Sequence, residues 1–147
     1  MPKSKLDAEL FVMCDFALVS KEGKLSIVGI FDRMFVTDLP SSFLRFFIVA
    51  TVKGEPGIEH KIKVKAESPS GKDFFASNEI SVTLGNNGRT HHITDVANFP
   101  LPETGEYKLK LLSQNKQLAK ITFSVTKVQD QNGNKEKSNK RRIRRCG

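Results

Sequence analysis

Three histidines and two cysteines are the side chains of this sequence best suited to hold a metal ion or to act as a base or nucleophile. His91 and His92 are adjacent, and neighbouring side chains of a strand point to opposite faces of its sheet. The pair therefore cannot easily share one ion, and no second ligand pair has the spacing of a zinc site. We expect polar histidines in a loop or at a strand edge, and no bound metal or other cofactor.

The remaining candidates for catalysis fall on the apolar sides of predicted strands. His60 alternates with isoleucines, which favours a packed core or rim histidine over a catalytic base. Cys14 shares its strand face with apolar residues, which predicts a buried thiol. Asp15 and Asp32 would act as paired carboxylates only if the fold brought them together. The sequence thus predicts no catalytic residue, and we expect a protein without enzymatic activity.

The stretch LPETG, residues 101–105, spells the signal that a bacterial sortase recognises. Such a substrate also needs a secretion leader and an apolar span after the motif. The apolar stretch near the N-terminus is interrupted by acidic residues, which a signal peptide avoids. Residues 106–127 carry five lysines that alternate with apolar residues, which predicts strands and not a membrane span. We therefore expect a cytoplasmic protein with no membrane span.

Within LPETG and the residues after it, Gly105 and Tyr107 form a predicted structural corner. The order acidic residue, glycine, tyrosine resembles the tyrosine corner of immunoglobulin-like sandwiches, where the hydroxyl bonds back to a nearby backbone group. Gly105 would permit a positive φ at the entry of the strand. An ordinary loop with an incidental tyrosine is the alternative. The chain has no Trp and no other Tyr, so an aromatic platform for sugars is not expected.

Alternation of apolar and polar residues runs through most of the first 128 residues and predicts strands at regular spacing. The fold class that this predicts is all-β, an antiparallel immunoglobulin-like β-sandwich of about eight strands, as one domain over residues 1–128. The expected strands are residues 8–19, 24–36, 43–53, 58–67, 73–84, 91–99, 106–112 and 117–128.

The segment Cys14–Val36, CDFALVSKEGKLSIVGIFDRMFV, also resembles part of an uncharacterised family. Its members are small bacterial β-sandwich proteins, a domain-of-unknown-function family, that pair an early strand with a second strand of the type "gKlsivGifd". The likeness continues through FPLPETGEYKL and covers roughly residues 8–127. The resemblance implies a bacterial immunoglobulin-like domain and offers no catalytic residues to transfer.

Residues 129–147 form a basic tail with seven Lys or Arg and two acidic residues, a net charge of +5. This segment has almost no apolar side chains to bury, which predicts that it is disordered. Clusters of Lys and Arg bind phosphate backbones and anionic surfaces without sequence readout, so weak nucleic-acid or anionic-surface binding is one candidate function. A solvated charge run that aids solubility is the alternative. The candidate polyanion-binding residues are Lys140, Arg141, Arg142, Arg144 and Arg145.

Both faces of the first three predicted strands are apolar, although a two-layer sandwich buries only one face of each strand. We therefore expect a surface that is covered by a partner, either a second copy in a homodimer or an unknown protein. The alternative is that loops fold over it. The candidate interface residues are Phe11, Met13, Val28, Ile30, Phe47 and Val49. The sequence thus favours a non-enzymatic module for protein–protein interaction.

Overall fold

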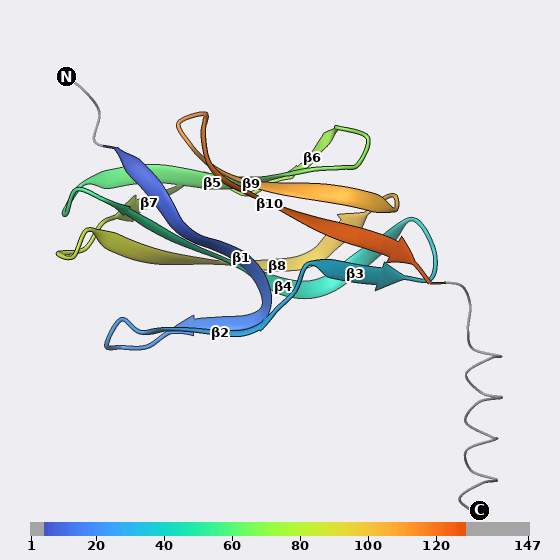
Figure 1. The fold of residues 1–147 in the computed structure, drawn as a ribbon, viewed down its shortest axis with the longest axis horizontal. Coiled ribbons are helices and arrows are strands. Elements are labelled where there is room, and N and C mark those ends of the chain that lie inside the picture. The colour runs from blue at the N-terminus through green and yellow to red at the C-terminus, as the bar shows by residue number, and fades with distance from the viewer. Residues whose placement is uncertain (1–4, 129–147) are drawn as a thin grey trace, which may run out of the picture.

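Two β-sheets packed face to face make up the part of the protein that the computed structural model describes, residues 5–128 (Figure 1). The first sheet has the strand order β2-β1-β4-β8. Its strands are β1 (Leu6–Val19), β2 (Leu25–Ile30), β4 (Ser41–Gly54) and β8 (Arg89–Leu101). The second sheet has the order β3-β10-β9-β5-β6, and β7 also pairs with β5. Its strands are β3 (Arg33–Val36), β5 (Glu59–Glu67), β6 (Asp73–Ala76), β7 (Ile80–Thr83), β9 (Gly105–Ser113) and β10 (Lys116–Lys127).

The predicted all-β class is confirmed, and the described residues form ten strands where about eight were expected. Two expected strands are each divided, residues 24–36 into β2 and β3 and residues 73–84 into β6 and β7. The first division occurs because the chain crosses from one sheet to the other at Phe31 and Asp32. The amide of Phe31 donates to the carbonyl of Met13, whereas the carbonyl of Asp32 accepts from Ser124. Beyond this crossing, β3 runs parallel to β10.

Regular alternation places the core residues of β5 and β9 between the two sheets, as the sequence predicts. On these strands the buried side chains are Ile62, Val64, Ala66, Tyr107, Leu109 and Leu111. Aromatic rings fill one end of the core, where Phe99 of β8 contacts the rings of Phe46, Phe74, Phe75 and Phe123. Because these rings come from four strands, β4 and β8 of the first sheet and β6 and β10 of the second, they connect both sheets.

The hairpin of β1 and β2 forms a third layer beneath the first sheet (Figure 1). The first half of β1 pairs with β4, from Leu6 to Cys14, and its second half pairs only with β2. Beyond Cys14 the hairpin packs on the outer face of the first sheet. There Cys14, Ala17 and Val49 are buried in a second apolar cluster, to which Leu10, Val12, Leu25, Ile27, Phe47 and Ile93 also belong.

Gly29 lies where the hairpin leaves the plane of the sheet. Its φ of +71° is a conformation that side chains other than glycine rarely adopt. A Cβ atom on this glycine would lie 2.4 Å from a carboxylate oxygen of Asp15 on the paired strand. The bend therefore needs a glycine at this position, both for its backbone and for its space.

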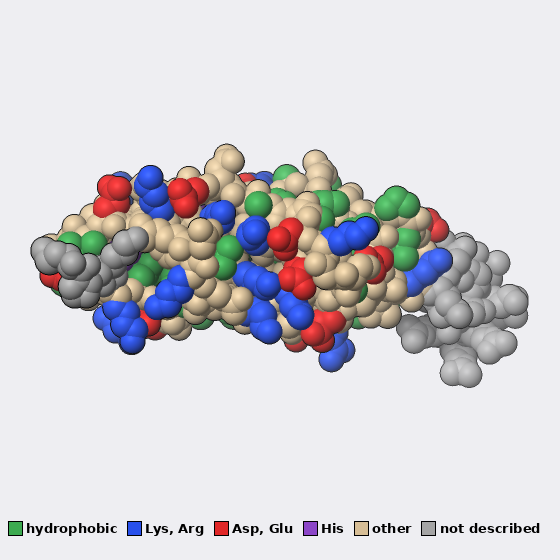
Figure 2. Space-filling view, turned by 90° about the horizontal axis from the view of Figure 1, so that it is seen from above, with side chains coloured by type: hydrophobic (Ala, Val, Ile, Leu, Met, Phe, Trp, Pro, Cys, Tyr) green, Lys and Arg blue, Asp and Glu red, His purple; other side chains and the backbone are tan. Residues whose placement is uncertain are grey.

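Charged side chains cover the outer face of the second sheet, which Figure 2 shows as basic and acidic groups spread among each other. Two ion pairs lie on this face, Lys110 with Glu67 at 2.8 Å and Lys65 with Asp73 at 3.3 Å. The second sheet thus buries one face and exposes the other, as expected for a two-layer sandwich. The first sheet differs, because both of its faces are apolar.

Candidate functional site

The outward side of the β1–β2 hairpin is an apolar surface, here called the hairpin face and made of Phe16, Leu18, Val28 and Ile30. These side chains are 42–62% exposed. Phe16 lies directly opposite Val28, and Leu18 follows Phe16 by two residues, so these three share one side. Ile30 follows Val28 beyond the bend at Gly29. Directly opposite residues have Cβ atoms about 4.5–5.5 Å apart, so the side chains of Phe16 and Val28 are neighbours across the hairpin.

The six candidate interface residues do not share one face, which corrects the expected grouping. Phe11 and Met13 are buried in the main core, and Val49 is buried beneath the hairpin. Phe47 is half-buried there, with its ring 5.6 Å from that of Phe16. A register shift in β1 between Ala8 and Leu10 reverses which side of the strand faces the core. Of the six, Val28 and Ile30 are exposed on the hairpin face.

Three of the six residues nevertheless meet at one place. Phe11, Met13 and Ile30 line a groove of about 370 Å³ between β1 and β10. Lys120 and Thr122 of β10 supply polar groups on its opposite side. Ile30 is the residue that the groove shares with the hairpin face.

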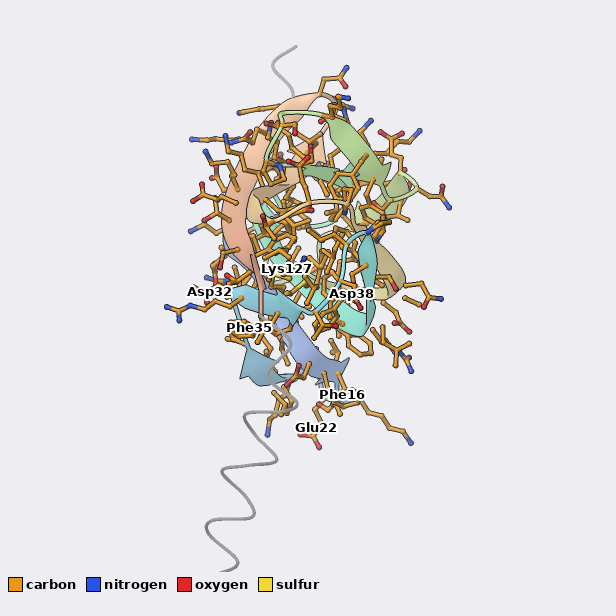
Figure 3. The ribbon with its side chains drawn as sticks, turned by 90° about the vertical axis from the view of Figure 1, so that its right-hand side faces the viewer. Phe16, Glu22, Asp32, Phe35, Asp38 and Lys127 are labelled. Atoms are coloured by element: carbon orange, nitrogen blue, oxygen red, sulfur yellow. The ribbon has the colours of Figure 1, made fainter. Side chains whose placement is uncertain are left out.

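Figure 3 views the end of the molecule at which the hairpin and β3 lie. Phe16 of the hairpin and Phe35 of β3 both reach this end, and Phe35 is 63% exposed. Glu22, Asp32 and Asp38 are the acidic side chains labelled in this view. Exposed aromatic rings therefore occur on this end together with carboxylates.

The predicted corner at Gly105 and Tyr107 is built from two hydrogen bonds. The Tyr107 hydroxyl donates to the carbonyl of Glu103 at 2.5 Å and accepts from the amide of Glu103 at 3.1 Å. Burial raises the pKa of this hydroxyl, which keeps it protonated as a donor. Gly105 has a φ of +126° and lies against Pro69, where a Cβ atom would come within 2.9 Å. The predicted bond from the hydroxyl to the backbone is confirmed, so the LPETG stretch has a structural role.

The two adjacent histidines point to opposite faces of the first sheet, as expected. His91 lies on the outer face, where its Nδ1 is 2.7 Å from the hydroxyl of Thr51. His92 faces inward opposite Ala50, and burial lowers the pKa of its imidazole. The third histidine, His60, is half-buried with an Nε2 atom that has no hydrogen-bond partner within residues 5–128. In this part of the chain, no three His, Cys, Asp or Glu residues are grouped to hold a metal ion.

His92 also lies in a cavity of about 160 Å³ that opens at one edge of the sandwich. The cavity is bounded by Ile48, Ala50, Ile62, Lys63, Val64, Ser77, Asn78, Ile80, His92, Thr94 and Leu111. Sequence reasoning did not identify this site. The feature that indicates the site is the pair of polar residues His92 and Thr94 at inward positions of β8, where a sandwich normally has apolar residues.

The lowered pKa of His92 predicts a pH-dependent stability. Below pH ~6.5, His92 binds a proton more readily in the unfolded chain than in the folded protein, because burial lowers its pKa in the folded state. The free energy of unfolding therefore falls as the pH falls. His92→Leu should reduce the loss of unfolding free energy between pH ~7 and pH ~5, a window above the ordinary pKa of carboxylates. Urea denaturation at the two pH values measures this. An equal loss in parent and variant would contradict the prediction.

Two other expectations concern Cys14 and the tail. Cys14 is a free, fully buried cysteine, and burial raises the pKa of its thiol, so it does not have the properties of a nucleophile. The candidate polyanion-binding residues Lys140, Arg141, Arg142, Arg144 and Arg145 lie outside the described residues. Their role stays a prediction, as does the boundary between the domain and the tail. Residues 5–128 contain no helix long and apolar enough to cross a membrane.

Comparison with protein families decides the relationship of this chain. The sequence model of DUF6941, a family of unknown function, matches residues 9–126. The chain belongs to this family. The expected membership of an uncharacterised family is thereby confirmed for most of the chain. A comparison of this DUF6941 member with curated proteins found no match.

Several solved structures resemble the DUF6941 chain in fold. The Pseudomonas fluorescens alkylpurine DNA glycosylase AlkC, bound to DNA containing an abasic site analog, has a TM-score of 0.55 and 9% identity, over 84% of this chain and 31% of that chain. A β-glucosidase from Listeria innocua in complex with glucose has a TM-score of 0.51 and 8% identity, over 84% and 16%. A CARDB domain from Pyrococcus furiosus in complex with di-metal ions has a TM-score of 0.46 and 14% identity, over 85% and 96%.

The DUF6941 chain spans no more than a third of the glycosylase and of the glucosidase. At 8–9% identity these likenesses show the fold alone. They therefore support the β-sandwich architecture of residues 5–128 and assign no activity to the chain.

Proposed function

We propose that this protein is a non-enzymatic interaction module that binds its partner through the hairpin face. The observation that carries the proposal is the exposure of four large apolar side chains, Phe16, Leu18, Val28 and Ile30, on one hairpin. Soluble monomeric proteins rarely expose a contiguous apolar patch of more than a few hundred Å². Apolar patches above that size commonly mark interaction sites. The hairpin is part of the domain that the DUF6941 family shares, since the match covers residues 9–126.

A second copy of the chain is the partner that suits this face best. A two-fold axis brings the same surface of both copies together, so a surface that is apolar throughout is complementary to itself. Ser26 lies opposite Leu18 on the paired strand and is the polar residue on this side of the hairpin. Because the hairpin face contains no charged side chain, two copies meet there without burying like charges. Burial of the four side chains then favours association.

The site's chemistry supports a binding function over catalysis. The adjacent histidines are divided between the two faces of the first sheet, and Cys14 is buried as a thiol. The structure describes no cluster of metal-binding side chains between residues 5 and 128. An immunoglobulin-like relationship and a location in a bacterial cytoplasm are part of the proposal and stay predictions.

Lysine substitutions on the hairpin face test the proposal. Val28 and Ile30 are 58% and 62% exposed, so lysines at both positions should leave the fold intact. We expect the parent to form a dimer whose population rises with concentration in analytical ultracentrifugation. The variant V28K/I30K should be a monomer with the same melting temperature, because the lysines bring four charges into the interface.

A matched control carries lysines at Phe35 and Leu44, which are as exposed but lie outside the hairpin face. This control should still form the dimer. A parent that sediments as a monomer at high micromolar concentration would exclude the homodimer. Equal dissociation of both variants would show that added charge, and not the hairpin face, controls association.

A further inference from the structure

The cavity that contains His92 lies at the open edge between the two sheets, away from the hairpin face. On one side are β4 and β8, which contribute Ile48, Ala50, His92 and Thr94. On the other side is β5, with the link that joins β6 to β7. The strand β8 is the last strand of the first sheet, and β7, which pairs with β5 and contributes Ile80 to the cavity, contacts β8 on this side.

The link between β6 and β7 holds the rim of the cavity in place. The amide of Ser77 donates to the carbonyl of Val64 at 2.8 Å, and the Ser77 hydroxyl accepts from the amide of Val64 at 2.9 Å. These two bonds replace the strand pairing that is interrupted between β6 and β7. The adjacent Asn78 lines the cavity next to these bonds.

The cavity has an apolar floor and an uncharged polar opening. Its floor consists of the side chains of Ile48, Ala50, Ile62, Val64, Ile80 and Leu111. Its polar groups are the imidazole of His92, the hydroxyl of Thr94 and the amide of Asn78. These three side chains make no hydrogen bond to other side chains within residues 5–128, so their donors and acceptors are available to a ligand.

Lys63 touches the cavity from the outer side of β5. It lies opposite Leu112, and the inward neighbours of this pair are Val64 and Leu111. Paired residues of antiparallel strands point to the same face, so the side chain of Lys63 is directed to the outer face. A charged ligand group inside the cavity would therefore lack an opposite charge.

We propose that this cavity is a binding site for a small, uncharged ring compound that carries one hydrogen-bonding group, such as a phenol. The volume of about 160 Å³ fits a single six-membered ring. An engineered cavity of about 150 Å³ in another protein holds benzene, which supports the estimate of size. The apolar floor contacts the ring, and the polar group of the ligand bonds His92 or Thr94 at the opening. The site is independent of the proposed interaction through the hairpin face.

Titration of the full-length protein with phenol, benzene and benzoate, followed by NMR of the backbone amides, tests this site. Phenol should cause saturable shifts at Ala50, Ile62 and Thr94 and no shifts on the hairpin. Benzene should bind about fivefold more weakly because it makes no hydrogen bond. Benzoate should bind more weakly than either, because its carboxylate is desolvated without a partner charge.

The two adjacent histidines provide a matched pair of variants. His92→Leu should remove the preference for phenol over benzene, whereas His91→Leu, on the outer face, should keep it. Ala50→Leu should abolish binding of both ligands, because the larger side chain occupies the floor. If Ala50→Leu does not fold, the comparison of His91→Leu with His92→Leu still tests whether phenol binds in this cavity.

Several results would overturn the proposal. These are the absence of saturable shifts with phenol and benzene, shifts that map to the hairpin, and equal effects of His91→Leu and His92→Leu. Tighter binding of benzoate would also overturn it, because it would require a positive charge in the cavity. None of these outcomes bears on the homodimer, which the sedimentation experiment tests separately.

Discussion

Phe99→Ala should lower the free energy of unfolding by about 3–5 kcal/mol, which would be the largest effect of a single substitution considered for this protein. The Phe99 side chain is fully buried, and its ring lies 5.1–6.1 Å from four other aromatic rings. Those rings belong to both sheets, so the cavity left by alanine cannot close by movement of one strand. Urea denaturation followed by fluorescence or circular dichroism measures the loss.

Phe35→Ala is the control for this prediction. The Phe35 ring is 63% exposed, so its removal should change the stability by no more than about 0.5 kcal/mol. Similar losses in the two variants would contradict the assignment of Phe99 to the centre of the aromatic core.

Tyr107→Phe should lower the free energy of unfolding by about 1–3 kcal/mol with an unchanged m-value. The substitution removes one hydroxyl, and with it the two hydrogen bonds to the backbone of Glu103. The ring remains in place, stacked on Phe123 at 5.1 Å, so the loss reports the hydroxyl alone. The partners that lose their bonds are main-chain groups at a partly buried turn.

A variant as stable as the parent would show that water replaces both bonds at Glu103. In that case the corner would not explain why the LPETG stretch has its conformation. A loss accompanied by a changed m-value would instead indicate an altered unfolded state or a loss of two-state behaviour.

Local patterns predicted several features because they depend on near neighbours in the sequence. The strict alternation of β5 placed Ile62, Val64 and Ala66 in the core, where the structure has them. The spacing of Gly105 and Tyr107 predicted a bond from the hydroxyl of Tyr107 to a nearby backbone group, which in the structure is the carbonyl of Glu103. The opposite directions of His91 and His92 follow from the two-residue period of a strand. Each of these features involves residues within one strand or turn.

Other features depended on which segments meet in space, and the sequence alone does not contain that information. Both sides of β1 are apolar, so alternation could not show that Phe11 and Met13 face the core. The register shift near Ala8 exchanges the two sides, and such a shift is defined only against the paired strand β4. The crossing at Phe31 and Asp32 was hidden for the same reason, because the alternation continues while the chain changes sheets.

The sequence by itself determined that this is an all-β protein with a tyrosine corner, since those properties arise from residue types and short spacings. Only the tertiary structure decided that the β1–β2 hairpin covers the first sheet, leaving Val28 and Ile30 exposed and Val49 buried. It also decided that His92 and Thr94 open into a cavity. The physical reason is that burial depends on contacts between segments that are distant in the sequence. The hydrophobic effect is non-directional, so the apolar residues of a strand do not specify which segment will cover them.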